Sequence, residues 1–219
     1  MYKTFLIMLP LGLGVFLSPE IWMPGLLLAA SKEKAGWKAW FFCLGGAGGI
    51  GLLITIGFFL NATTPEGPSW TRFFIRAGLG TLLFFAGIHI LFKGEKGPSK
   101  KNLSHLAEKA GLKTAVLLGF AVTGLNLKVA SLTIAAGHQL SLFSNAMTPR
   151  LEGLLLFLGL SLLPVTLPAI VETVKPGLVR TLIEPCNRFM ALYGRWIVIA
   201  ICLVMGGTLW RHALAVLPA

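Results

Sequence analysis

Four polar side chains inside otherwise apolar segments are the residues of this sequence that could do chemistry. Ser18 and Glu20 interrupt an apolar run near the start of the chain, and Asn126 and Lys128 interrupt another in its later half. A charge near the middle of a bilayer costs about 3 kcal/mol on insertion scales, so each needs a partner. We expect Glu20 and Lys128 to form either a substrate- or proton-coupled pair or a structural ion pair. A third alternative leaves Lys128 at the membrane surface, away from Glu20.

Two prolines and a glycine beside these polar residues predict breaks in both helices. Pro19 and Pro24 remove backbone donors, and Gly124 supplies flexibility before Asn126. Hydrocarbon cannot satisfy the freed backbone groups, so the breaks must face other helices or water. Ser18 and Asn126 would offer hydrogen bonds there, and Trp22 is a candidate gate.

The composition predicts that helices carry these residues across a membrane. The chain has 219 residues, of which 55% are hydrophobic and only 12% charged, and its mean hydropathy is +0.80. Soluble domains carry a more charged surface, and a spanning helix needs roughly 20 apolar residues. We therefore predict an all-α polytopic membrane protein whose six transmembrane helices cover about residues 5–30, 39–60, 70–92, 114–142, 152–171 and 189–211.

The basic residues predict the orientation of the chain. The formal net charge is +11, and most Lys and Arg residues lie after the first, third and fifth expected helices. Cytoplasmic loops carry such an excess, so we predict that both termini lie outside and that loop 93–113 is cytoplasmic. We expect the cytoplasmic (inner) membrane of a prokaryote, with membrane lipids rather than nucleic acid as partners of the basic residues.

The two interrupted helices predict an internal repeat. Residues 1–92 form a first three-helix repeat, residues 93–113 a basic loop and residues 114–219 a second three-helix repeat. Because three is an odd number, the second repeat must be inverted in the membrane. Inverted repeats with broken helices 1 and 4 meeting at mid-membrane are a transporter design.

Several further patterns bear on packing and on chemistry. Gly45 and Gly49 have a spacing that lets helices approach closely, and this face also permits a homodimer. Segment 172–188 is basic and proline-punctuated, and could include a short interfacial helix. The three cysteines form no CxxC pair, and no histidines have ligand spacing with a carboxylate, so we expect neither a metal site nor a cofactor. No nucleophile–base pair is present, so we do not expect an enzyme.

Short motifs resemble the LysE-type exporter superfamily, and within it the GAP-like group of peptidoglycolipid- or sulfolipid-addressing proteins. They are the Leu17-Ser18-Pro19 step, the Ser-Lys-Glu-Lys loop that begins at Ser31, the glycine-rich second helix and Asn126-Leu127-Lys128. The resemblance implies two inverted helix triplets and export of small metabolites, or help in moving envelope lipids outward. Leu127 stands where the family usually has proline.

These observations predict an integral-membrane transporter that exports a small polar or zwitterionic, amino-acid-like metabolite by alternating access, driven by ion or proton coupling. Its binding residues would be Glu20, Lys128, Asn126 and Ser18. One alternative is a non-transporting scaffold or addressing factor for the export of an envelope lipid such as a peptidoglycolipid. Another is a metal-ion exporter.

Overall fold

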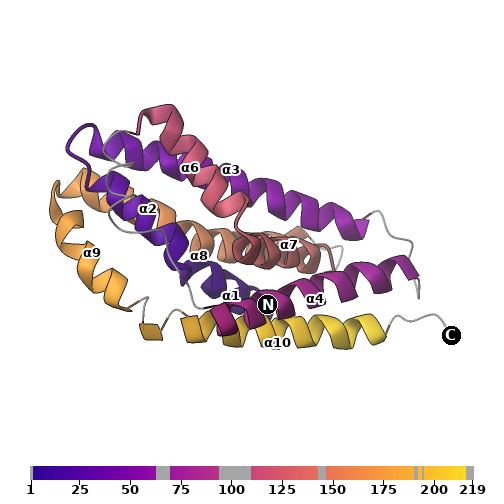
Figure 1. The fold of residues 1–219 in the computed structure, drawn as a ribbon. Coiled ribbons are helices and arrows are strands. Elements are labelled where there is room, and N and C mark those ends of the chain that lie inside the picture. The colour runs from indigo at the N-terminus through magenta and orange to yellow at the C-terminus, as the bar shows by residue number, and fades with distance from the viewer. Residues whose placement is uncertain are drawn as a thin grey trace.

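The chain folds into helices throughout the part that the structure describes (Figure 1). This computed structural model describes residues 2–62, 70–93, 110–142, 147–189, 192–193 and 195–215. The helices are α1 (Tyr2–Phe16), α2 (Pro19–Ala29), α3 (Ala35–Ala62), α4 (Trp70–Lys93), α6 (Leu112–Gly124), α7 (Leu127–Leu142), α8 (Met147–Val174), α9 (Leu178–Phe189) and α10 (Arg195–Leu214). The predicted all-α class is confirmed for these ranges.

Three segments are long and apolar enough to cross a membrane, in agreement with a multi-pass protein. They are Ala35–Leu60 in α3, Met147–Val174 in α8 and Trp196–Leu214 in α10. The bent pairs α1–α2 and α6–α7 would bring the number to five if each pair forms one span. The apolar part of α4, Phe73–His89, is shorter, so the sixth span stays a prediction.

Both helices that were expected to break are bent in the structure. The axis turns by 52° between α1 and α2, and by 69° between α6 and α7. The first break falls at Leu17 and Ser18, and the second at Leu125 and Asn126. Pro24 lies inside α2, within a continuous helix.

The helix α3 packs directly against both halves of the second broken pair. Along this contact, a Cβ atom added at Gly45 would overlap the Val116 carbonyl group in α6, and one added at Gly137 would overlap the Ile54 carbonyl group in α3. The close approach predicted for Gly45 is therefore confirmed, and the partner lies within the same chain. Small residues allow such backbone contact between membrane helices.

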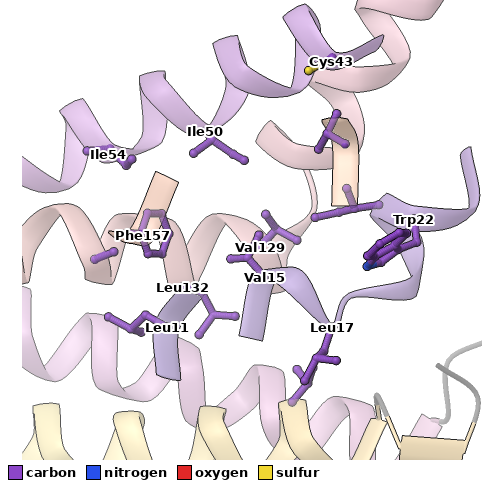
Figure 2. Close-up of a cluster of buried hydrophobic side chains, with 14 of the residues drawn as sticks. Leu11, Val15, Leu17, Trp22, Cys43, Ile50, Ile54, Val129, Leu132 and Phe157 are labelled. Atoms are coloured by element: carbon purple, nitrogen blue, oxygen red, sulfur yellow. The ribbon is translucent and has the colours of Figure 1, made fainter. Parts of the chain in front are cut away.

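The remaining helices complete a layered arrangement around α1, α7 and α8. Figure 1 shows α3 and α6 along one edge of the molecule and α4 and α10 along the other. Figure 2 shows Val15 of α1 beside Val129 and Leu132 of α7, with Ile50 of α3 and Phe157 of α8 around them, and all five are fully buried. This packed interior fixes the positions of both breaks.

Candidate functional site

The first break is closed by side chains that satisfy carbonyl groups at the end of α1. The Ser18 hydroxyl donates to the Gly14 carbonyl oxygen at 2.9 Å, and the Trp22 indole Nε1 donates to the Phe16 carbonyl oxygen at 2.6 Å. The last carbonyl groups of a helix have no intrahelical donor, so such partners are needed in a membrane. Pro19 occupies the first position of α2, where its missing N–H costs nothing.

The second break is organised by Asn126, whose side chain caps the start of α7. Its Oδ1 accepts hydrogen bonds from the backbone N–H groups of Lys128, at 3.1 Å, and Val129, at 3.4 Å. Asparagine is among the best capping residues because its side chain satisfies these otherwise unpaired donors. Gly124 is the last residue of α6, two residues before the cap.

The two breaks meet, and they bring an acid, a base and an amide into contact. The Lys128 Nζ lies 3.2 Å from the Glu20 Oε2. The Asn126 Nδ2 donates a short hydrogen bond to the same carboxylate oxygen. Glu20 lies in the first turn of α2, and Lys128 lies in the first turn of α7, so two helix N-termini converge on this point.

The electrostatics of the site favour the acid and oppose the base. A helix N-terminus carries a partial positive charge, which stabilises the Glu20 carboxylate and disfavours the Lys128 ammonium. The Lys128 side chain is only 6% exposed, whereas that of Glu20 is 33% exposed. The carboxylate therefore offsets an otherwise costly buried cation, while remaining reachable from outside the protein.

Pro24 lies inside α2, four residues after Glu20. In a helix the N–H of residue 24 would donate to the carbonyl oxygen of Glu20, but proline has no N–H. Residue 24 therefore cannot supply the donor that the Glu20 carbonyl oxygen would receive in a regular helix. Pro24 does not break the helix, since α2 continues past it to Ala29.

The structure thus brings three of the four predicted binding residues together. Glu20, Lys128 and Asn126 are in contact, whereas the Ser18 hydroxyl donates to the Gly14 carbonyl oxygen at the end of α1. Trp22 is 8% exposed and packs edge-on against Phe16, which places it in the protein interior rather than facing lipid.

One polar residue beside the second break escaped the sequence reasoning. Thr123 is fully buried, and its hydroxyl lies 3.2 Å from the Gly46 carbonyl oxygen and 2.9 Å from that of Gly119. It thereby links the end of α6 to α3 at a place where a glycine allows close contact. The signal was present in the sequence, as a threonine directly before Gly124 and three residues before Asn126.

Within the described ranges, no three His, Cys, Asp or Glu side chains are grouped so that they could hold a metal ion. The arrangement of Glu20, Lys128 and Asn126 can instead bind charged groups.

Comparison with known protein families gives a match that covers most of the chain. A family model described as "Sap, sulfolipid-1-addressing protein" matches residues 8–215. No curated protein and no solved structure matches the chain.

Proposed function

Because the chain belongs to the sulfolipid-1-addressing protein family, we propose that it helps to move a lipid with an anionic head group outward across the cytoplasmic membrane. The observation that carries this proposal is the contact between Glu20, Lys128 and Asn126 at two helix breaks. Polar groups at breaks in membrane helices are typical of substrate and ion sites.

The arrangement of the two halves supports a transporter-like design. The broken helix of the second half, α6–α7, packs on α3 of the first half. Reciprocally, the broken helix of the first half, α1–α2, packs on α8 of the second half. Such reciprocal packing, in which the broken helix of each half contacts the other half, is expected of two inverted three-helix repeats. This is the design of the LysE-type exporters that the sequence resembles.

In the proposed mechanism, Glu20 and the anionic head group alternate as partners of Lys128. A proton that binds the Glu20 carboxylate neutralises it and leaves the Lys128 ammonium to pair with the sulfo group of the lipid. When the proton leaves Glu20, the carboxylate again attracts Lys128 and the lipid is released. Because Glu20 is the more exposed partner, it is the one that a proton can reach. Proton movement would thus drive lipid movement.

This proposal predicts different defects for the two members of the ion pair. In proteoliposomes with a fluorescent, short-chain sulfated glycolipid as the probe, Glu20→Gln should retain binding but lose at least tenfold in outward flux. This is because glutamine imitates the protonated acid and cannot release a proton. Lys128→Gln should lose binding itself, because the cation is removed. Equilibrium binding and flux across the bilayer are measured on the same preparations.

Matched controls separate these effects from charge changes in general. Glu33→Gln and Lys113→Gln make the same substitutions at exposed positions away from the site, and both variants should behave like the wild type. Monodisperse elution in detergent establishes that each variant is folded. Normal flux through a folded Glu20→Gln variant would refute the coupled mechanism.

A second candidate is export of a small zwitterionic metabolite, such as an amino acid. The observation that favours it is the presence of both charge signs in one site, since separated Glu20 and Lys128 side chains could receive an amine and a carboxylate. Uptake of a labelled amino acid mixture into inverted proteoliposomes, without sulfated-lipid flux, would favour this candidate. A scaffold without transport would show neither flux and would tolerate Glu20→Gln in lipid delivery.

A further inference from the structure

The helix α9 buries only one side of its apolar surface against the rest of the chain. Val179 is fully buried, and Ile183 and Cys186 are partly buried, so one stripe at helical spacing faces the protein. This stripe packs against α2 and α8. The contact fixes how the helix is rotated about its own axis.

A second apolar stripe on α9 is exposed beside the first. Leu178, Leu182, Pro185 and Phe189 are spaced four, three and four residues apart, and all four are exposed. At 3.6 residues per turn, these positions lie along one side of the helix. Phe189 contacts the ring of Tyr193, with 5.4 Å between the ring centroids, yet it stays 48% exposed, and Leu178 and Leu182 are 37% and 36% exposed. An exposed apolar stripe of this length favours an apolar environment.

The charges around this stripe are mainly basic. Lys175, Arg180 and Arg188 are exposed on α9 or just before it. Of the nearby acids, Glu172 accepts hydrogen bonds from the Gly177 N–H at 3.1 and 3.2 Å, and Glu184 is exposed. A basic amphipathic helix of this kind suits the surface of an anionic leaflet.

Neighbouring contacts place α9 at the level expected for a membrane surface. The Arg180 Nε donates to the Ala30 carbonyl oxygen at 3.3 Å, where α2 ends. At the same end of the molecule, Trp40 Nε1 donates to the Thr173 hydroxyl at 3.2 Å, and Trp37 is exposed nearby on α3. Tryptophans gather at membrane–water interfaces.

We infer that α9 lies in the plane of the membrane surface and binds anionic phospholipid, with its exposed apolar stripe inserted among acyl chains. Lys175 and Arg188 pair with lipid phosphates, while the other apolar stripe stays on α2 and α8. This inference is independent of what the Glu20–Lys128 site transports, because no residue is shared between them.

Site-directed spin labelling in nanodiscs tests this inference on the full chain, after the three native cysteines are replaced by alanine. Leu182→Cys places a label on the exposed apolar stripe, and Thr181→Cys places one on the polar side of the same turn. With phosphatidylglycerol mixed into phosphatidylcholine, the label at 182 should be several-fold more accessible to oxygen than to a water-soluble nickel complex. The label at 181 should show the opposite preference.

The role of the charges is tested by lipid composition. In phosphatidylcholine alone, or with Lys175→Gln and Arg188→Gln combined, the label at 182 should move to a shallower depth. Equal water accessibility of the two labels in the anionic nanodiscs would overturn the inference. The same depth of the label at 182 with and without phosphatidylglycerol would also overturn it. Spin–spin coupling between labels at 182 would also overturn it, because a second copy of the chain would then cover the stripe.

Discussion

Asn126 performs two tasks with one side chain. Its Oδ1 caps α7, and its Nδ2 donates to the Glu20 carboxylate. The first task concerns helix stability, and the second concerns the charge and orientation of the site. The two can be separated because a short side chain can cap a helix without reaching across to a neighbouring one.

We predict that Asn126→Ala lowers the free energy of unfolding by about 1 kcal/mol, because the capping hydrogen bonds are lost. Asn126→Ser should stay close to the wild type in stability, since serine is also a good cap. Both variants should impair lipid flux, because neither can donate to Glu20. Unfolding by titration with SDS in mixed micelles, followed by circular dichroism, measures the first effect. Equal stability of the alanine variant and the wild type would contradict the capping role.

Much of the site could be predicted from residue types, whereas its fine geometry could not. Contact between Glu20 and Lys128 was expected in two of the three alternatives, because isolated charges in apolar helices need partners, and the two side chains do meet, with Asn126 beside them. The direction of the Ser18 hydroxyl and the role of the Trp22 indole depend on which carbonyl groups the break leaves free. The order of residues does not specify those groups, because the break could have fallen at either proline.

At the scale of elements, the contact between α3 and α6–α7 is the tightest backbone packing that glycines create in the described chain. Gly45 and Gly49 face α6, while Gly57 faces the Ile134 carbonyl group in α7. In membranes such contacts replace the hydrophobic driving force, which lipid does not supply between helices. Their removal should therefore act on stability directly.

We predict that Gly45→Ala destabilises the protein by about 1–3 kcal/mol, as overpacking typically does. The added methyl group would overlap the Val116 carbonyl group of α6. Gly51→Ala in the same helix is the matched control, because nothing lies within 4 Å of its added Cβ atom. That control should be neutral or slightly stabilising, since alanine favours helices over glycine. Equal loss in both variants, measured by SDS titration, would show that the glycines act through helix propensity instead.

The extents of the helices were largely predictable because apolar runs of this length have few other structures open to them. The helix expected at 39–60 is α3, Ala35–Ala62, and that expected at 152–171 is α8, Met147–Val174. The expected and observed bounds differ at the helix ends, because polar residues such as Lys38 belong to the helix although their low hydropathy predicts that it ends before them. Hydropathy measures the preference for lipid, whereas helix bounds depend on backbone hydrogen bonds.

At the scale of the whole molecule, charge is distributed unequally between the two ends. The turn between α2 and α3 and the turn between α8 and α9 lie together, as the contact of Arg180 with Ala30 shows. The opposite end holds the contact of Arg76 with the His212 carbonyl oxygen and that of Arg150 with the Phe58 ring. Among the described residues, the turns after α2 and α8 therefore lie at one end, and Arg76 and Arg150 lie at the other (Figure 1).

We predict that the end with the α8–α9 turn is cytoplasmic, because of the excess of basic residues there. In intact bacterial cells, a membrane-impermeant maleimide should label Ala215→Cys, and it should label Lys175→Cys only after permeabilisation. Both positions are exposed, so accessibility within the protein is matched. The native cysteines are again replaced by alanine. The reverse labelling pattern would show that the chain is inserted the other way round.

The two broken helices are held by contacts of different kinds. Gly45 and Gly137 allow the backbone of α3 to contact the backbones of α6 and α7. The helix α3 therefore spans that break and holds α6 and α7 in place. By contrast, Gly12 of α1 meets the flexible side chain of Leu160 in α8, a continuous helix that contains Pro164 and Pro168. If the protein opens alternately to the two sides of the membrane, we expect α3, α6 and α7 to stay fixed relative to one another. We then expect α1, α2 and α8 to move as one unit, and this motion would carry Glu20 towards or away from Lys128.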